Sequence, residues 1–468
     1  MSIFKPSTFI PKITTSLHRL VGSNFSKNLA IYNEQNCSDS LVTVEINKEA
    51  ILHNYNWYLK LIGEGRRIAP VLKSNAYGHG LVETAKILES IISRQDAKVG
   101  VEFFTVDSMF EAYALRAGGI HTKILVLGFV DPKIIARNTL PNVIFMITSL
   151  EQARALVKER TIVVNRLFNK IFETKIEVHI KVNTGMNRQG IRPEEVDECI
   201  AILTHLSLDT LHTGIKITGF ASHFAEADSV QPEISSKTIK QISTWNSLVK
   251  ILRQRPEFSE SKAIFHISNT AGTLFTKVQK VANKNEASLA SNPVQVIDAD
   301  VCRIGIGLFG YSDIKNHEKH LIPALSMHTI ISGIYNIKIG DSVGYSSTWV
   351  AKRNSIIATI PAGYYEGIDR RLSNKGFVTV FGYTSTGELA TNKVFKCPII
   401  GRVSMNITTI DITDAMVAAN NDNLEIKLGS KVNILDSNFN ARDMGNMCDT
   451  IPYEILVHIQ GQLKRIYK

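Results

Sequence analysis

One lysine in this chain stands in a context that suits covalent chemistry with a carbonyl group. Lys73 ends an apolar run in the segment VLKSNAYGHG, residues 71–80, and a loop that holds Tyr77 and two glycines follows it. A lysine amine that has lost its proton is a nucleophile and forms Schiff bases with carbonyl compounds. A lysine at a strand end more often extends its ammonium group into water, so the assignment depends on what other segments bring to the same place.

The elements that would position Lys73 follow a repeating pattern. From about residue 43 to residue 312, short β-branched runs alternate with amphipathic helical stretches, which is typical of parallel βα units. Eight such units predict an α/β fold with a TIM (β/α)8 barrel. The predicted strands lie near residues 68–73, 99–105, 123–127, 143–147, 176–182, 215–221, 263–267 and 300–304.

A barrel makes the chemistry testable by position, because active sites of this fold collect at the carboxyl ends of the strands. Five candidate residues follow or end five different predicted strands: Lys73, Arg188, His223, Thr270 and Arg303. We therefore expect their side chains to meet at one rim of the barrel.

The sequence pattern changes near Leu321, where short predicted strands separated by Gly, Asn and Asp replace the helical stretches. This pattern predicts a β-rich carboxy-terminal domain. We predict a flexible amino-terminal extension at residues 1–42, a barrel domain at residues 43–320, and a β-rich domain at residues 321–468.

The lysine segment resembles the pyridoxal phosphate (PLP) lysine signature of bacterial alanine racemases. Further segments resemble that family in the family's order, over roughly residues 43–468. They are HIKVNTGMNRQGI (179–191), GFASHFAEAD (219–228), HISNTAG (266–272), VCRIGIGLFGY (301–311), VGYSSTW (343–349), CPIIGRVSMNITTID (397–411) and IPYEIL (451–456). The resemblance implies a PLP-dependent isomerase that interconverts L-alanine and D-alanine and supplies D-alanine for the peptidoglycan of the cell wall.

Racemisation needs an electron sink, which PLP supplies, and two bases on opposite faces of the α-carbon. The resemblance implies that Lys73 holds PLP and acts as one base, and that Tyr345 acts as the other. Both groups titrate near pH ~10 when free, so each needs surroundings that make proton transfer easier. The resemblance also places His223 in a relay with Tyr345, and Arg303 against the pyridine nitrogen, which a permanently charged guanidinium leaves unprotonated.

Other family positions imply binding roles. Tyr77, Asn269, Thr270, Gly305, Ile306 and Tyr453 would bind the cofactor, most of them at its phosphate group, which hydroxyl and backbone N–H donors suit. Arg188 and the backbone of Met405 would bind the substrate carboxylate, and Lys181 matches a lysine that is carbamylated in some members. In the family, the tyrosine and the methionine complete the partner's site, so Tyr345 and Met405 imply a homodimer.

Four positions depart from the family's usual pattern. Asn183 and Asn406 stand where aspartate is common, Thr270 stands where serine is usual, and Ser346 stands where glycine is frequent. Neither asparagine replaces a proton-transfer group, so these two exchanges bear on rate and substrate range more than on reaction type. Thr270 keeps the hydroxyl and is a harmless exchange, and Ser346 is a lesser change. A broad-specificity amino-acid racemase, a related barrel-type decarboxylase and a noncatalytic PLP-binding homeostasis protein are the alternatives. A decarboxylase leaves Tyr345 without a role, and the homeostasis proteins resemble a lone barrel without the second domain.

Composition narrows the function classes further. The net charge is +10, but basic residues are dispersed among acidic ones, so we expect no nucleic-acid binding. The five cysteines are widely spaced and form no CxxC pair, which favours a reducing cytoplasm and predicts no metal site. We also expect no membrane-spanning helix.

Overall fold

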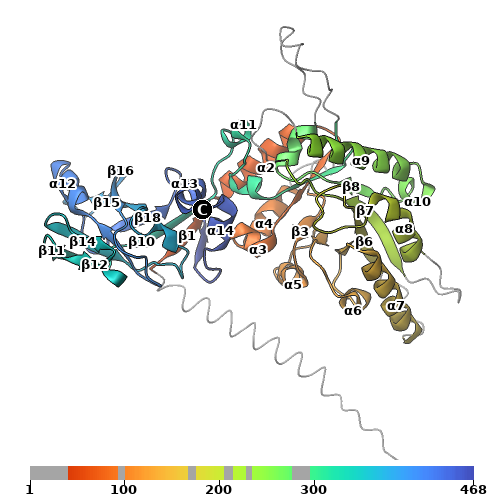
Figure 1. Cartoon of the computed structure of the whole chain (residues 1–468), viewed down its shortest axis with the longest axis horizontal. Coiled ribbons are helices and arrows are strands. Elements are labelled where there is room, and N and C mark those ends of the chain that lie inside the picture. The colour runs from red at the N-terminus through yellow and green to blue at the C-terminus, as the bar shows by residue number, and fades with distance from the viewer. Residues whose placement is uncertain (1–40, 93–100, 167–174, 205–213, 228–234, 277–295) are drawn as a thin grey trace, which may run out of the picture. The chain divides into compact units, whose positions relative to one another are not determined.

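The computed structural model describes residues 41–92, 101–166, 175–204, 214–227, 235–276 and 296–468. Most of the predicted extension at residues 1–42 therefore lies outside the described residues. The chain forms two compact units (Figure 1). Of the described residues, the barrel unit comprises those within Glu45–Ser326, Leu435–Ile459 and Tyr467–Lys468, and the β unit comprises residues 41–44, Met327–Ile434 and Gln460–Ile466. The division predicted from the sequence stays a prediction, but Leu435–Ile459 group with the barrel although they follow residue 320.

Eight parallel strands build the barrel, as the sequence predicts. They are β2 (Arg67–Pro70), β3 (Phe104–Val106), β4 (Ile124–Val126), β5 (Val143–Ile147), β6 (Ile176–Lys181), β7 (Ile215–Ala221), β8 (Ile264–His266) and β9 (Val301–Ile304). Neighbours from β3 to β8 pair in parallel in chain order, and β2 pairs with β9. Two further sets of contacts close the ring. The N–H of Leu72 donates to Thr105 O at 2.8 Å beside β3, and the N–H of Asp300 donates to Phe265 O at 2.8 Å beside β8.

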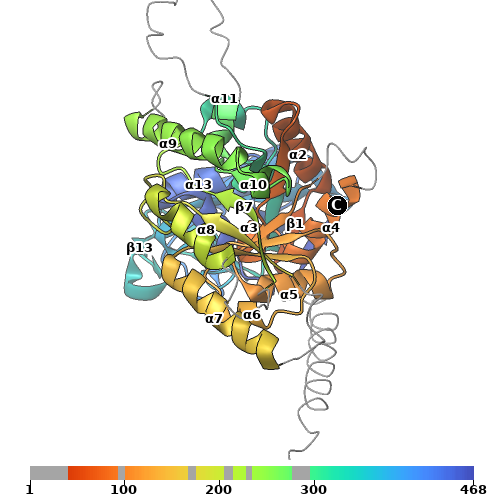
Figure 2. The same ribbon diagram turned by 90° about the vertical axis from the view of Figure 1, so that its right-hand side faces the viewer.

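Helices surround these strands in Figure 2. They are α2 (Lys48–Ile62), α4 (Leu81–Ile92), α5 (Met109–Ala117), α6 (Pro132–Ala136), α7 (Leu150–Arg166), α8 (Val196–Thr204), α9 (Ser236–Arg253) and α10 (Pro256–Ser259). Shorter helical segments are α3 (Lys73–Tyr77), η1 (Pro193–Glu195), η2 (Ala271–Thr276), η3 (Ile306–Phe309) and α11 (Lys315–Glu318). The helix starts follow from local sequence: Asn47, Ser108 and Ser235 each accept a backbone N–H of the first turn with the side-chain oxygen.

The interior of the barrel is a packed core. Side chains from different strands meet there, and the buried cluster consists of Ala69, Phe103, Leu125, Ile144, Met146, Ala221 and Val301. This arrangement leaves the strand ends, and not the interior, for a ligand site. The predicted TIM barrel is thereby confirmed.

The β unit has mainly antiparallel strands. A six-stranded sheet has the order β16 (Leu389–Pro398), β15 (Phe377–Tyr383), β18 (Lys431–Leu435), β10 (Leu325–Ile330), β1 (Thr43–Ile46) and β19 (Arg465–Tyr467). A three-stranded sheet has the order β11 (Gly333–Ile337), β14 (Ser355–Ile360) and β17 (Thr408–Asp411). The remaining elements are β12 (Ser342–Val343), η4 (Tyr345–Ser347), β13 (Trp349–Val350), η5 (Arg370–Leu372) and α12 (Thr413–Asn421). The predicted β-rich carboxy-terminal part is confirmed.

Two short helices from the end of the chain pack in the barrel unit. They are α13 (Ala441–Cys448) and α14 (Pro452–Val457). The N–H of Ala441 donates to Tyr311 Oη at 3.3 Å, which joins α13 to the segment after β9. This packing brings Tyr453, on α14, to the barrel.

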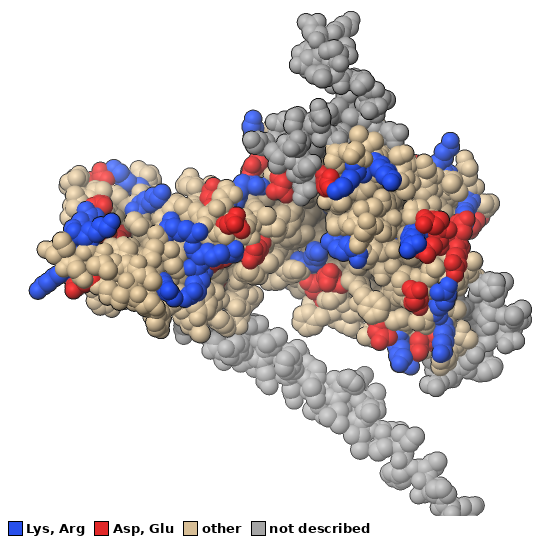
Figure 3. All heavy atoms as spheres, viewed as in Figure 1, with Lys and Arg blue, Asp and Glu red and all other residues tan. Residues whose placement is uncertain are grey.

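Charge and hydropathy add two observations. On the face seen in Figure 3, acidic side chains lie between basic ones on both units. Of the helices in the described ranges, none combines the length and apolarity needed to cross a lipid bilayer.

Candidate active site

Lys73 is followed by a left-handed turn that the sequence pattern does not predict. Ser74, Asn75, Ala76 and Tyr77 have φ angles of 56°, 55°, 53° and 52°, so four consecutive non-glycine residues lie in the left-handed region. Each such residue costs roughly 1–2 kcal/mol relative to the right-handed form. Backbone strain of this kind persists only where the surroundings impose it, and it gathers at functional sites.

Tight contacts hold the far side of this turn. Asn75 Oδ1 accepts the N–H of Leu81 at 2.9 Å, at the start of α4. Gly78 has a φ of 83°, and a Cβ placed on it would lie 2.2 Å from the carbonyl oxygen of Leu456 in α14. The bare glycine therefore lets α14 approach the lysine turn.

Replacing Gly78 with alanine tests this approach. Gly119 is a matched control, because its φ is also 83° but a Cβ there would meet nothing within 4 Å. Both variants place an alanine at a left-handed φ, which costs stability in each. Only Gly78→Ala must also push α14 away. We expect Gly78→Ala to lower the free energy of unfolding by about 1–3 kcal/mol more than Gly119→Ala, measured by urea denaturation. Equal losses in the two variants would show that the contact with Leu456 is unimportant.

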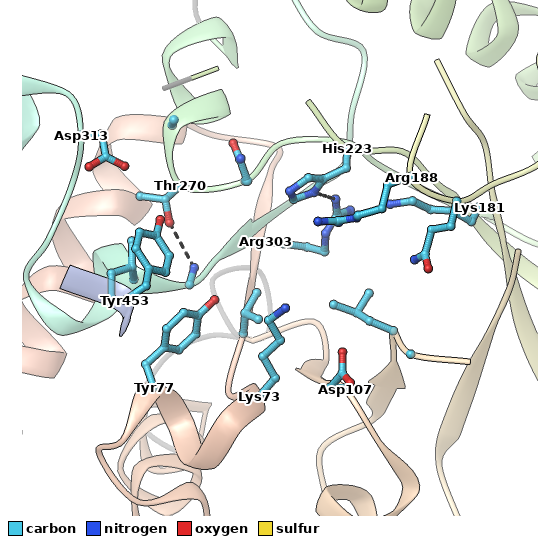
Figure 4. Close-up of a pocket in the computed structure, with 18 residues that line it drawn as sticks. Lys73, Tyr77, Asp107, Lys181, Arg188, His223, Thr270, Arg303, Asp313 and Tyr453 are labelled. Carbon is cyan, nitrogen blue, oxygen red and sulfur yellow. Dashed lines mark hydrogen bonds between the residues drawn. The ribbon is translucent and has the colours of Figure 1, made fainter. Parts of the chain in front are cut away.

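A cavity of about 430 Å³ opens at the carboxyl ends of the barrel strands (Figure 4). Eleven residues predicted from the sequence line it: Lys73, Tyr77, Lys181, Arg188, His223, Asn269, Thr270, Arg303, Gly305, Ile306 and Tyr453. The barrel thus brings together side chains that are spread over most of the sequence.

Seven further lining residues were not predicted: Val71, Asp107, Leu127, Gly128, Gln189, Ala271 and Asp313. Asp107 could have been predicted, because it directly follows β3 and active-site residues of this fold lie at the carboxyl ends of the strands. Asp313 lies well beyond the end of β9 and has no local signal, and Arg442 of α13 forms an ion pair with it at 3.6 Å.

One end of the cavity gathers hydroxyl groups and backbone. The N–H of Gly305 donates to Thr270 Oγ1 at 3.2 Å, and a Cβ on Gly305 would lie 2.4 Å from Tyr77 Oη. The rings of Tyr77 and Tyr453 are 5.9 Å apart between centroids, and burial raises the pKa of Tyr77. Neutral hydroxyls and N–H groups converging on one spot form a site for an anion such as phosphate.

Arg303 occupies the middle of the site and is only 3% exposed. Its Nη2 atom donates to Ser222 O at 2.6 Å and to Ile267 O at 3.1 Å, and it lies 3.2 Å from His223 Nδ1. Its Nη1 atom donates to His266 O at 3.0 Å and to His266 Nδ1. Burial lowers the pKa of Arg303 to about 10, so the guanidinium keeps its charge at neutral pH.

The charge on Arg303 determines the tautomers of two fully buried histidines. Because Arg303 can only donate, His266 Nδ1 accepts, and the proton of His266 lies on Nε2. His266 Nε2 lies 2.8 Å from His179 Nδ1, which must accept in turn, so His179 carries its proton on Nε2. Burial, with the nearby charges of Lys123 and Arg303, lowers the pKa of His179 to about 3, and burial with Arg303 lowers that of His266. Both rings are therefore neutral. No sequence motif indicates that these two buried histidines form a pair.

Lys181 and His223 share the cationic end of the cavity. Burial and the charges of Arg303, Arg188 and Lys73 lower the pKa of Lys181, which is 6% exposed, well below its usual value. Burial and the charge of Arg303 lower the pKa of His223. Figure 4 shows both side chains close to Arg303 and Arg188. This end favours neutral amines and imidazoles, and it attracts anions.

The structure shows the contacts that each of the two asparagines makes. Asn183 Oδ1 accepts the N–H of Gly185 at 3.1 Å and that of Asn187 at 3.0 Å, which shapes the loop that presents Arg188. An amide oxygen does this as a carboxylate oxygen would. In the β unit, Asn406 Nδ2 donates to Glu366 Oε1 at 2.7 Å, a contact that an aspartate could not make without setting two carboxylates against each other.

Tyr345 and Met405 do not line the cavity within this chain. Both belong to the β unit, where they are 71% and 55% exposed. Tyr345 begins η4, and Ser346 after it has a φ of 61°, a conformation that suits the glycine frequent in the family. The barrel unit alone thus supplies one of the two predicted bases.

Comparisons with known proteins indicate one family. Residues 46–313 match the family model described as alanine racemase, N-terminal domain, and residues 324–467 match alanine racemase, C-terminal domain. Alanine racemase 1 of Caldanaerobacter subterraneus is 30% identical over 430 residues, covering 91% of this chain and 94% of that protein.

Solved structures share the fold. Alanine racemase from Bacillus anthracis with bound L-Ala-P aligns with a TM-score of 0.70 at 28% identity, covering 91% of this chain and 95% of that one. Alanine racemase from Clostridium difficile 630 aligns with a TM-score of 0.69 at 26% identity, covering 92% and 96%. The two family models together span both units, and the resemblance seen in the sequence is confirmed: this chain belongs to the alanine racemase family.

Proposed function

We propose that this chain is a PLP-dependent alanine racemase that interconverts L-alanine and D-alanine. The observation that carries the proposal is the convergence of Lys73, Arg303 and the hydroxyl-rich anion site on one cavity at the barrel rim. A cytoplasmic enzyme of this kind would supply D-alanine for peptidoglycan synthesis. Membership of the family supports the same substrate pair.

The residues around the cavity fit PLP. Lys73 would hold the cofactor covalently, and Tyr77, Thr270, Tyr453 and the backbone at Gly305 and Ile306 would bind its phosphate. Asn269 lies beside them and accepts the N–H of Gly272 at 2.8 Å, which shapes the turn after β8. The exclusion of a Cβ at Gly305 keeps Tyr77 Oη next to this backbone. When bound, PLP supplies the electron sink that makes the α-proton of the amino acid removable.

The side chains would divide the proton transfers by face. Lys73 Nζ would take the α-proton of D-alanine or return one to that face, and Tyr345 Oη of the partner would do the same on the L face. Arg303 keeps its own protons and would therefore bind the pyridine nitrogen without protonating it. Arg188 would hold the substrate carboxylate together with the Met405 backbone of the partner.

Lys181 would act on Arg188. Burial and the nearby cations lower the pKa of Lys181 and so raise the neutral fraction of its amine. A neutral amine nitrogen can add to the carbon of CO₂ and release one proton. The resulting carbamate is an anion, and it would pair with Arg188 and orient it. We therefore propose that Lys181 is carbamylated.

The exposure of Tyr345 and Met405 supports a homodimer in which each β unit completes the partner's site. The resemblance assigns both residues to the active site, yet neither lines the cavity of its own chain, so a second copy of the chain would supply them.

The first experiment is incubation of the PLP-loaded protein with L-alanine in deuterated water, followed by chiral chromatography with mass detection. We expect D-alanine that carries deuterium at the α-carbon, because each product proton comes from a base that exchanges with solvent. Lys73→Ala should yield neither product. Bound PLP without either product in the natural protein would contradict the proposal and favour another substrate or a binding role.

A further inference from the structure

We infer that Glu111 is a positioning residue for Lys73, acting through the backbone of the left-handed turn. This inference rests on the proposed function of Lys73 as the PLP lysine. Glu111 does not line the cavity, and its position in the third residue of α5 would ordinarily mark it only as a helix-capping residue.

The carboxylate of Glu111 accepts three backbone N–H groups. Oε1 accepts the N–H of Ser74 at 2.6 Å, and Oε2 accepts those of Asp107 at 2.8 Å and Ser108 at 3.3 Å. The bond to Ser108 belongs to the capping box, but the bond to Ser74 crosses from α5 to the residue that directly follows Lys73. Glu111 therefore connects a helix start to the lysine turn.

This connection is made where the backbone is most strained. Ser74 is the first of the four residues with left-handed φ, so its N–H lies at the point where the chain departs from β2 and Lys73. Asn75 holds the other side of the turn through the N–H of Leu81. Since a strained turn relaxes when its anchors are lost, the bond to Glu111 should determine where the lysine side chain starts.

Both carboxylate oxygens of Glu111 are needed to accept these hydrogen bonds. Three N–H groups point at its two oxygens, and a carboxylate offers acceptors on both. A glutamine of the same size has one acceptor oxygen, and its NH₂ group would face an N–H. Glu111→Gln must therefore lose the bond to Ser74 or the bonds to Asp107 and Ser108.

Ser108→Ala is the matched control. Ser108 Oγ accepts the N–H of Glu111 at 3.3 Å, so its loss breaks the capping box from the other side and leaves the carboxylate bond to Ser74 in place. If Glu111 only caps α5, the two variants should behave alike. If Glu111 positions the lysine turn, only its own variants should disturb Lys73.

Two measurements separate these cases. Hydrogen exchange of the Ser74 amide is followed in the apoprotein by mass spectrometry, and capture of added PLP by Lys73 is followed by borohydride trapping and peptide mapping. We expect Glu111→Gln to speed the exchange of the Ser74 amide by on the order of tenfold. We expect the PLP concentration for half-maximal trapping to rise by on the order of tenfold as well. This is the size expected for losing a hydrogen bond to a charged group. Ser108→Ala should cost the start of α5 about 1 kcal/mol. Because it leaves the Ser74 N–H bonded to Glu111, it should change both measurements much less than Glu111→Gln does.

Equal effects of Glu111→Gln and Ser108→Ala, or no effect of Glu111→Gln, would overturn the inference. Glu111→Asp provides a second variant if Glu111→Gln does not fold, since it keeps the charge but withdraws the carboxylate from Ser74, and it should also speed the exchange. A natural protein that traps no PLP at Lys73 would refute the proposed function instead, and the exchange at Ser74 would still decide whether Glu111 holds the turn.

Discussion

Replacing Tyr345 with phenylalanine should slow exchange of the α-proton of L-alanine by about 10²–10⁴-fold, the usual contribution of a positioned acid or base, while exchange from D-alanine persists. The variant lacks only the oxygen that would act on the L face, and Lys73 remains for the D face. Racemisation should fall equally in both directions, because the equilibrium between the enantiomers does not depend on the enzyme. Proton exchange in deuterated water, measured separately from each enantiomer, distinguishes the two faces.

The control for this variant is Tyr335→Phe. Tyr335 lies in β11 of the same unit and is 55% exposed, so it loses a comparable hydroxyl without a proposed role. Equal slowing of exchange from both enantiomers in Tyr345→Phe would contradict the assignment of the tyrosine to one face.

Mixing two inactive variants tests whether Tyr345 acts across a dimer. In a heterodimer of Lys73→Ala and Tyr345→Phe, one site contains both defects and the other contains neither. After random subunit exchange, about a quarter of all sites should be intact, so activity should return to about a quarter of the natural value. A mixture that stays inactive would mean that Tyr345 serves the barrel of its own chain.

The second large effect concerns stability in mild acid. His179 and His266 are fully buried and neutral, with the pKa of His179 lowered to about 3 and that of His266 lowered in the same direction. In the unfolded chain both should titrate near pH ~6.5, so below that pH the unfolded state binds more protons than the folded state. Stability is therefore complete above pH ~6.5 and is lost as the pH falls below it. Each ring should cost about 1.4 kcal/mol per pH unit, or about 3 kcal/mol together at pH 5.5.

Urea denaturation between pH 7.5 and pH 5.5 measures this loss together with the loss from His223 and His317, whose pKa values burial also lowers. The window lies above the range in which most carboxylates titrate. His179→Gln can still accept from His266, and it should reduce the proton uptake on unfolding by about one. His458→Gln is the control, because the His458 side chain is 59% exposed. A free energy of unfolding that stays constant across the window would contradict the neutral buried pair.

Much of the barrel could be predicted from the sequence. The bounds predicted for β5 and β7, Val143–Ile147 and Ile215–Ala221, coincide with those in the structure, and the other six strands lie within or close to their predicted ranges. Buried parallel strands are short apolar runs between helical stretches, and such runs can be recognised from neighbouring residues alone. The eleven predicted cavity residues were found because their motifs are local as well.

The lysine turn was not predictable from the same information. Ser74, Asn75 and Ala76 have no local reason to adopt a left-handed conformation, and the anchors that impose it come from Glu111, Leu81 and Leu456. Such a turn depends on contacts between segments that are distant along the chain. Local propensity does not report them.

The sequence by itself determined the fold class, the family and the residue types of the site, because strand periodicity and motif order are properties of neighbouring residues. Only the tertiary structure decided that α14 brings Tyr453 to the barrel, that Arg303 fixes the protons of His266 and His179, and that Asp107 and Asp313 line the cavity. These features arise where chain segments far apart in sequence share a small, desolvated space. In that space, burial and neighbouring charges determine hydrogen bonds and pKa values that the residue type alone leaves open.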